Sequence, residues 1–137
     1  MAETLARIVD GPIDRAELEE FAGTSADGAV VVFEGVIRDH DHGERVSGLE
    51  YSAHPDALAF LEEICDRVAQ ESGLRIAAAH RIGNLEIGDV ALVAVVAAAH
   101  RREAFETCSR LVDEIKAGVP IWKRQLLADG ATEWVGL

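Results

Sequence analysis

The feature that most constrains the fold is an uninterrupted apolar run over residues 90–99, the longest in the chain. A membrane-spanning helix needs about 20 such residues, so this run has the length of a strand instead. A second apolar run, over residues 28–37, is rich in valine and is also typical of a buried strand. Together the two runs predict a buried sheet at the centre of the protein.

Helices are predicted wherever apolar residues recur at helical spacing. The first covers residues 14–21 and opens with an aspartate and a glutamate in an arrangement like a capping box. The second begins at a proline and stops at a glycine, over residues 55–73, and the third covers residues 101–117, before Gly118 and Pro120. Further strands are predicted at 46–53, 74–82, 89–99, 121–127 and 132–135, with a polar loop at 38–44 and a turn at 83–88.

This order mixes strands and helices without strict alternation. The predicted class is therefore α/β (α+β), a sheet packed against helices. With 137 residues, the chain fits a single domain over 1–137, and a domain near that size buries roughly 68–70% of its unfolded surface. The strands at 28–37 and 46–53 are expected to pair across the polar loop between them.

The net charge of the chain excludes some classes of binding partner. The formal net charge is −12, which argues against a nucleic acid or a membrane surface. Residues 1–99 carry 19 acidic and seven basic side chains, whereas residues 100–137 carry six of each, including both lysines of the chain. This distribution indicates a local cationic site near the end of the chain, although two lysines also fall close together by chance.

The N-terminal residues lack the basic start and apolar stretch of a signal peptide, which predicts a cytoplasmic protein. In that compartment Cys65 and Cys108 need not pair. Both lie among helix-spaced apolar residues, so we interpret them as small buried side chains. No Cys-x-x-Cys pair or zinc-type spacing is present.

The helix at 101–117 carries cations where a helix normally disfavours them. His100, Arg101 and Arg102 stand at its N-terminus, where the helix dipole and free N–H groups favour an anion. On a helical wheel, Arg101 falls inside the apolar face and Lys116 at its edge. That face is predicted to comprise Phe105, Cys108, Leu111, Val112 and Ile115. The pattern indicates an anion site, and its competing interpretation is an arginine pair held by surface salt bridges.

Lys116 and Lys123 flank a Gly-Val-Pro turn. The turn can fold the chain back and bring both ammonium groups to one pocket. Lysines beside other cations or apolar walls serve as bases or nucleophiles. The alternative is a pair of ordinary surface lysines.

Other polar residues give weaker signals. The run Asp-His-Asp-His at 39–42 has metal-binding side chains, but a polar loop has the same composition, and no metal is predicted. His54 and His80 are isolated and are expected to be structural. No Gly-x-Ser-x-Gly, phosphate-loop or dinucleotide motif occurs.

Several motifs occur together in a fixed order. The first half of the chain carries Gly-Ala-Val-Val-Val-Phe-Glu-Gly-Val-Ile-Arg at 28–38 and Leu-Glu-Tyr at 49–51. The second half carries His-Arg-Ile-Gly at 80–83, His-Arg-x-x-Ala-Phe at 100–105 and Pro-Ile-Trp-Lys-Arg at 120–124. In this combination, the chain resembles the large subunits of molybdopterin synthase over residues 28–135.

The resemblance implies an α/β hammerhead fold with an added small antiparallel β subdomain. It also implies a sulfurtransferase of molybdenum cofactor biosynthesis that needs no cofactor. Such large subunits form a homodimer within a heterotetramer, and each binds a small ubiquitin-like sulfur carrier. The carrier's Gly-Gly tail ends in a thiocarboxylate, whose sulfur converts cyclic pyranopterin monophosphate into the dithiolene of molybdopterin.

The resemblance also implies roles for individual residues. Lys116 and Lys123 match the family's two functional lysines and are the expected catalytic residues. The residues expected to bind substrate are Phe33, Val36, Ile37, Arg38, His100, Arg101, Lys116, Lys123, Arg124 and Gln125. Gln125 stands where members of the family often have an acidic residue.

Without the resemblance, two other classes of function fit the same residues. A non-catalytic module that senses a phosphorylated metabolite would use the cationic helix start but would not need both lysines. A lysine-based acid/base enzyme acting on a phosphorylated heterocycle would turn over without any carrier protein.

Overall fold

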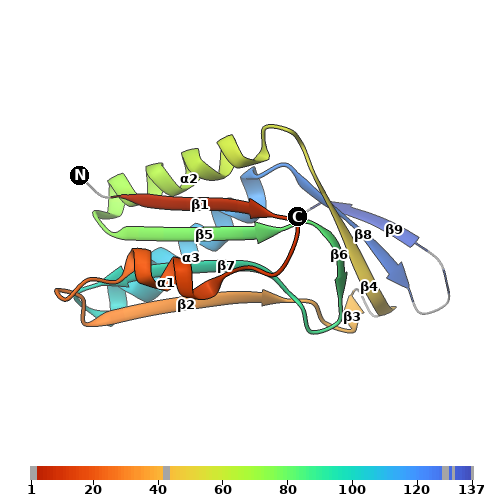
Figure 1. Ribbon diagram of the computed structural model, residues 1–137, viewed down its shortest axis with the longest axis horizontal. Coiled ribbons are helices and arrows are strands. Elements are labelled where there is room, and N and C mark those ends of the chain that lie inside the picture. Colours follow the sequence, from red (N-terminus) through yellow and green to blue (C-terminus); the bar gives the residue numbers. More distant parts are fainter. Residues whose placement is uncertain (1–2, 42–43, 128–129, 131, 137) are drawn as a thin grey trace.

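The computed structural model describes residues 3–41, 44–127, 130 and 132–136. Within these residues the chain forms two sheets and three helices (Figure 1). In chain order the elements are β1 (Thr4–Val9), α1 (Arg15–Ala22), β2 (Ala29–Val36), β3 (His40–Asp41), β4 (Glu44–Ala53), α2 (Ala57–Ser72), β5 (Arg75–Arg81), β6 (Gly83–Glu86), β7 (Val90–Ala98), α3 (Arg101–Gly118), β8 (Ile121–Leu127) and β9 (Thr132–Gly136).

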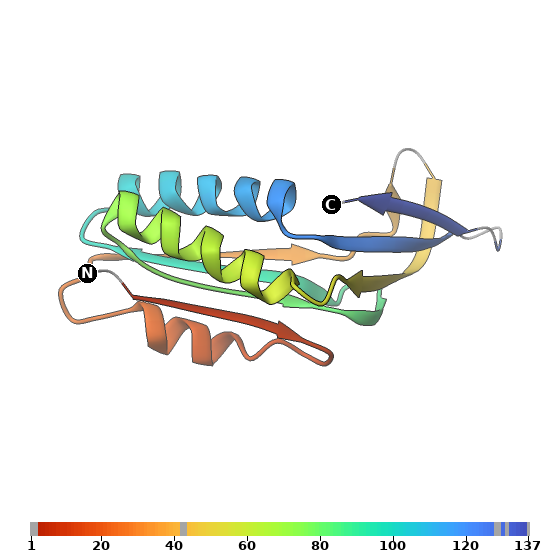
Figure 2. The same cartoon turned by 90° about the horizontal axis from the view of Figure 1, so that it is seen from above.

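The first sheet has the order β1-β5-β7-β2, and only the β1–β5 pair in it is parallel. Helices α2 and α3 cover one face and α1 covers the other (Figure 2). Successive side chains of β7 alternate between the two faces: Ala94 and Val96 pack toward α2 and α3, whereas Val93 and Val95 pack toward α1. The apolar run at 90–99 is therefore a strand covered on both faces, as its composition indicated.

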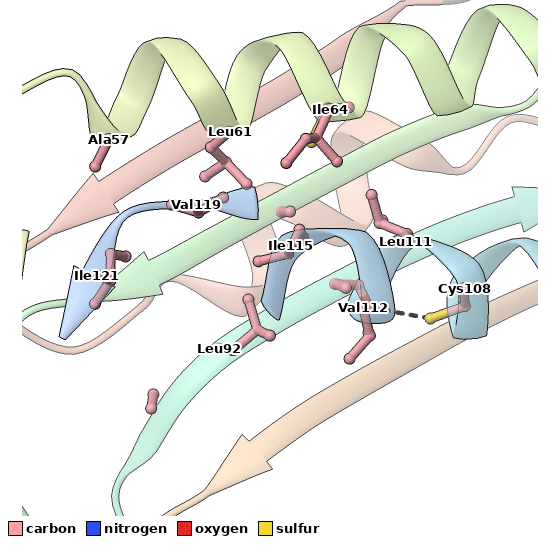
Figure 3. Close-up of a cluster of buried hydrophobic side chains, with 14 of the residues drawn as sticks. Ala57, Leu61, Ile64, Leu92, Cys108, Leu111, Val112, Ile115, Val119 and Ile121 are labelled. Atoms are coloured by element: carbon pink, nitrogen blue, oxygen red, sulfur yellow. Dashed lines mark hydrogen bonds between the residues drawn. The ribbon is translucent and has the colours of Figure 1, made fainter. Parts of the chain in front are cut away.

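The larger core lies between this sheet and the helices α2 and α3 (Figure 3). Leu61 of α2 and Leu111 and Ile115 of α3 are fully buried there. Cys65 and Cys108 are free thiols in the same core, which confirms that both are small buried side chains. Burial raises the pKa of the Cys65 thiol to about 12 and also raises that of Cys108, so neither is disposed to act as a thiolate.

The second sheet has the order β3-β4-β8-β9, with β6 also paired to β4, and all of its pairs are antiparallel. It extends from one end of the first sheet, beyond the C-terminal end of α3 (Figure 2). The predicted α/β (α+β) class is confirmed, and this sheet is the small antiparallel unit that the resemblance implied.

Three expectations about strands were wrong. The strands expected to pair with each other, β2 and β4, lie in different sheets: β2 pairs with β7, and β4 pairs with β6 and β8. Part of the predicted turn at 83–88 is strand β6, and part of the loop at 38–44 is strand β3. Strand β1 was not predicted, because its residues, Thr4–Val9, are half-buried and mixed in polarity; parallel pairing with β5 decides their conformation.

The ends of the helices follow their local sequence closely. Asp14 caps α1 by accepting a hydrogen bond from the Glu17 amide at 3.2 Å, and Gly73 ends α2 with a φ of 75°. Gly118 is the last residue of α3, where a Cβ would stand 3.0 Å from the side chain of Ile64. Phe105, expected in the core face of α3, is instead 60% exposed, because it lies on the side of the helix toward the edge strand β2, where it lines a surface groove.

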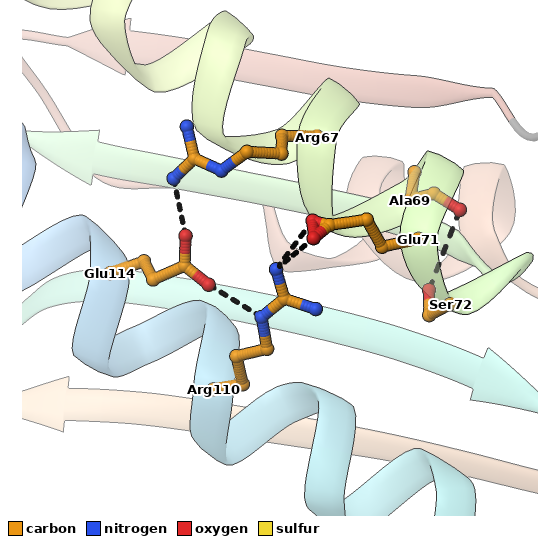
Figure 4. A network of polar contacts seen from close by, with 6 residues as sticks. All are labelled: Arg67, Ala69, Glu71, Ser72, Arg110 and Glu114. Carbon is orange, nitrogen blue, oxygen red and sulfur yellow. Dashed lines mark hydrogen bonds and ion pairs between the residues drawn. The ribbon is translucent and has the colours of Figure 1, made fainter.

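A network of ion pairs ties α2 to α3 (Figure 4). Glu114 of α3 accepts from Arg67 of α2 and, at 2.6 Å, from Arg110 one turn before it. Arg110 in turn reaches Glu71 of α2 at 2.9 Å. The hydrogen bond from Arg67 is the main cause that holds the pKa of Glu114 below its ordinary value of 4.5, with Arg110 adding to it.

Replacing Glu114 by glutamine is expected to lower the free energy of unfolding at neutral pH by roughly 0.5–1 kcal/mol, as for a partly exposed network. Because the pKa of Glu114 is lowered in the folded state, its contribution is present above the unfolded pKa and is lost as pH falls through the folded pKa. Urea unfolding of wild type and Glu114→Gln should therefore differ at pH 7 and converge in acid. Glu19→Gln, which removes an exposed pair with Arg15, is the matched control; a constant difference between wild type and Glu114→Gln at all pH values would contradict the ion-pair explanation.

Candidate functional site

A pocket of about 400 Å³ lies where the two sheets meet the C-terminal end of α3. The end of β2, the start of β7, the last turn of α3 and the facing strands β4 and β8 all contribute to it. Its lining consists of Gly35, Val36, Ile37, Arg38, His40, Leu49, Tyr51, His80, Ala91, Leu92, Ile115, Lys116, Lys123 and Gln125. Six of the predicted substrate-binding residues are thus brought together from elements far apart in sequence: Val36, Ile37, Arg38, Lys116, Lys123 and Gln125.

One wall of the pocket is a single face of the second sheet. In the β4–β8 pair, Lys123 stands opposite Tyr51 and Gln125 stands opposite Leu49. Directly opposed residues bring their side chains together on one face, and residues two apart on a strand share that face at a spacing of about 7 Å. Lys123 and Gln125 therefore point into the pocket, and the residue between them, Arg124, points away from it.

The opposite wall is opened by a glycine and a bulge. Gly35 pairs with Leu92, and the pairing shifts register directly after it, so that Val36 pairs with Val90. A Cβ on Gly35 would stand 3.4 Å from the Leu92 Cβ and 3.5 Å from the Phe33 ring, so a larger side chain would enter the space beside the pocket. Glycines and bulges within strands often mark such openings.

The charge of the pocket is opposite to that of the chain. Arg38, Lys116 and Lys123 line it, and none of the described lining residues is an aspartate or a glutamate, although the chain carries a net charge of −12. The carboxylate of Asp39, next to the rim, lies 2.7 Å from Nδ1 of His40. A group of cations in a partly enclosed space attracts anions and stabilises negative charge that develops there.

His80 forms part of the pocket wall and is only 3% exposed. Its ring meets the Tyr51 ring edge-on, with the centroids 5.0 Å apart, and its Nδ1 lies 2.8 Å from the Arg81 carbonyl oxygen. Burial lowers the pKa of His80 to about 4, and the charge of Lys116 acts in the same direction. The imidazole is therefore neutral at physiological pH.

The other predicted cations lie elsewhere on this chain. His100 and Arg101 are exposed at the N-terminal end of α3, where they line a separate depression with Arg102 and Phe105. Arg101 and Lys116 are fifteen positions apart along the helix, which corresponds to about 22 Å at 1.5 Å per residue. Within one copy of the chain, the cations at the two ends of α3 do not meet.

Two further predicted residues also lie outside the pocket. Phe33 lines an apolar groove of about 340 Å³ between β2 and α3, together with Phe105 and Val112. Arg124 is on the outer face of the second sheet, where its guanidinium lies 3.4 Å from Glu50 and 5.7 Å from the centroid of the Trp134 ring. Their assignment to substrate binding stays a prediction.

Among the residues that the structure describes, no group of three or more His, Cys, Asp and Glu side chains is arranged to hold a metal ion. His42, part of the run considered as a metal ligand, lies outside the described residues. No helix of the described part is long and apolar enough to cross a membrane.

Sequence reasoning missed Gly35, Leu49, Tyr51 and His80 as lining residues. Two of them could have been suspected from the sequence: Gly35 is a glycine inside an apolar strand, and His80 is a histidine at the end of the apolar strand β5. Leu49 and Tyr51 are two residues apart in the strand predicted at 46–53 and so share a face, but which element they face depends on the pairing of β4 with β8.

Comparisons with known proteins agree with this fold. A family model described as MoaE protein matches residues 8–118. Molybdopterin synthase catalytic subunit 1 of Mycobacterium tuberculosis is 39% identical over 132 residues, which are 95% of this chain and 89% of that protein. The crystal structure of molybdopterin synthase from Staphylococcus aureus matches with a TM-score of 0.87 and 36% identity, covering 95% of this chain and 96% of that one. A chain in the complex of subunits 1 and 2 of molybdopterin-converting factor from Helicobacter pylori has the same fold, with a TM-score of 0.73 at 24% identity over 96% of this chain and 88% of that one.

Proposed function

The chain belongs to the MoaE protein family, and we propose on that premise that it is the catalytic subunit of a molybdopterin synthase. In this function it transfers sulfur from the C-terminal thiocarboxylate of a small ubiquitin-like carrier to cyclic pyranopterin monophosphate. The product is the dithiolene of molybdopterin, and no cofactor takes part.

The observation that carries the proposal is the cationic pocket in an acidic chain. Both reactants are anionic, since the substrate bears a cyclic phosphate and the carrier tail ends in a thiocarboxylate. The two must approach each other, and Arg38, Lys116 and Lys123, with no acidic side chain among the described lining residues, offset their repulsion.

We assign different tasks to the two lysines. Lys123 is half-buried on β8 and faces the pocket beside Tyr51, so it contacts the thiocarboxylate and polarises its carbonyl group. Lys116 stands in the exposed last turn of α3, where it moves protons or transiently accepts the acyl group. Val36 and Ile37 line the approach, and Arg38 binds the phosphate.

The distance along α3 supports a role for a second copy of the chain. His100 and Arg101 match anion-binding residues of the family but lie about 22 Å from Lys116 along the same helix. We propose that the protein is a homodimer within a heterotetramer, and that His100 and Arg101 of one copy complete the pocket of the other.

We further propose that residues 1–137 act as one domain in the cytoplasm. The free thiols of Cys65 and Cys108 support the location, because unpaired cysteines are the usual state in a reducing compartment.

The test is reconstitution of the reaction from purified components. The protein is mixed with thiocarboxylated carrier and cyclic pyranopterin monophosphate, and molybdopterin is measured as its oxidised fluorescent derivative. We expect product with the thiocarboxylated carrier and none with a carrier that ends in an ordinary carboxylate. A stable complex with carrier and substrate that yields no product would favour the metabolite-binding module, and turnover of substrate without any carrier would favour the lysine-based enzyme.

A further inference from the structure

Two uncharged polar side chains, Gln125 and His80, are buried in the wall of the cationic pocket. Gln125 is 1% exposed and His80 is 3% exposed, whereas Arg38 and Lys116 are exposed and Lys123 is half-buried. The pocket therefore has two kinds of surface, with charged groups toward solvent and a neutral, hydrogen-bonding part at depth.

The amide nitrogen of Gln125 lacks a hydrogen-bond partner among the described residues. This Nε2 atom is fully buried, and it forms no hydrogen bond with an acceptor of the described residues. Buried polar groups nearly always have a partner, because an unpaired donor has lost its hydration without any replacement. Since Gln125 lines the pocket, the missing acceptor is best supplied by a bound ligand.

The ring of His80 presents a hydrogen-bond acceptor, whereas Gln125 Nε2 is a donor. A carbonyl oxygen only accepts, so the contact from Nδ1 to the Arg81 carbonyl places the proton of the neutral ring on Nδ1. Nε2 then carries a lone pair and accepts. The low pKa of His80, near 4, keeps this arrangement unchanged across physiological pH, with the nearby charge of Lys116 opposing any further protonation.

We propose that Gln125 and His80 together recognise one edge of an uncharged nitrogen heterocycle. The primary amide of Gln125 pairs with a lactam group of the ring, donating to its C=O and accepting from its N–H. His80 Nε2 accepts a hydrogen bond from the amino group next to that lactam. The inference rests on the proposed function, because the pterin ring of the proposed substrate presents this edge: C4=O, N3–H and the 2-amino group.

This assignment orients the substrate. With the pterin ring at depth and the phosphate at the cationic rim, the carbons that receive sulfur lie between the two ends, next to Lys116 and Lys123. A carboxylate at position 125 would accept two N–H groups and could not donate to C4=O, so glutamine makes this chain selective for a ring that presents an acceptor there.

The experiment measures binding of three free ring compounds by fluorescence titration, without carrier and without turnover. The probes are pterin, 3-methylpterin, in which a methyl group replaces the N3–H and blocks that edge, and lumazine, which has C=O in place of the 2-amino group. Wild type should bind pterin more tightly than either analogue. Gln125→Met should weaken pterin binding about tenfold, the loss of two modest hydrogen bonds, and should leave the binding of 3-methylpterin unchanged.

The second variant tests the histidine. His80→Phe keeps a ring against Tyr51 but removes the acceptor, so it should abolish the preference for pterin over lumazine while the preference over 3-methylpterin remains. Gln70→Met and His54→Phe, which make the same exchanges at exposed positions outside the pocket, should bind all three probes as wild type does.

A purely structural role for Gln125 would give a different result. Because its Nε2 has no partner in the described protein, Gln125→Met should leave the melting temperature unchanged or raise it. A lower melting temperature with unaltered pterin affinity would overturn the inference, as would equal binding of the three probes by wild type or no binding of pterin at all.

The same variants separate this inference from the proposed function. Sulfur transfer by wild type together with unaltered pterin binding by Gln125→Met would reject the recognition role and leave the function standing. The expected probe preferences without sulfur transfer from a thiocarboxylated carrier would reject the function and leave the recognition role standing.

Discussion

Alanine in place of Lys123 is expected to lower the rate of sulfur transfer at saturating substrate by about 10²- to 10⁴-fold. The loss has this size because a positioned cation that stabilises developing charge, or a group that moves a proton in the transition state, contributes on that scale. Lys123 is held by the pairing of β8 with β4 opposite Tyr51, so no other side chain of the strand can take its place. Single-turnover formation of molybdopterin, with preformed carrier complex, measures the effect on the chemical step.

The comparison with neighbouring variants makes the result specific. Lys123→Arg keeps the charge but changes its shape and reach, and should recover only part of the rate. Trp122→Phe changes the adjacent residue, which is exposed and lies on the opposite face of the strand, and should retain the wild-type rate. Lys116→Ala should also be strongly impaired; full turnover by either alanine variant would remove that lysine from the mechanism.

Mixing two inactive variants is expected to restore activity. Arg101→Ala and Lys123→Ala should each be nearly inactive alone, because every pocket of the dimer then lacks one essential cation. In a mixed dimer, one pocket combines Lys123 of one copy with Arg101 of the other, and the second pocket has neither. Random reassociation gives half mixed dimers with one intact pocket each, so about a quarter of wild-type activity should return.

The dimer experiment also identifies how the cations are shared. Mixing Lys116→Ala with Lys123→Ala should restore nothing, because both lysines line the same pocket of one chain. Full activity of Arg101→Ala by itself would show that the N-terminal end of α3 plays no part in the reaction. Activity of the variant mixture no higher than that of its components would place all essential cations within one copy.

The sequence by itself determined what depends on neighbouring residues. The apolar run at 90–99 became a strand covered on both faces, and Asp14 and Gly73 set the ends of their helices, because period and capping are local properties. The sequence also predicted that Lys116 and Lys123 line one pocket, because only a short turn separates α3 from β8. For the same reason the burial of Cys108 and Leu111 could be read from helical spacing.

Only the tertiary structure decided which distant elements meet. Strand partners are chosen by long-range pairing, so the sequence misplaced β2 beside β4 and gave no sign that Gln125 would stand opposite Leu49. Burial and hydrogen bonding then set the chemistry of these side chains. Gln125 Nε2 has no hydrogen-bond partner among the described residues, and burial lowers the pKa of His80 to about 4. The length of α3 likewise separates Arg101 from Lys116, because a helix is rigid and its two ends cannot fold back on one pocket.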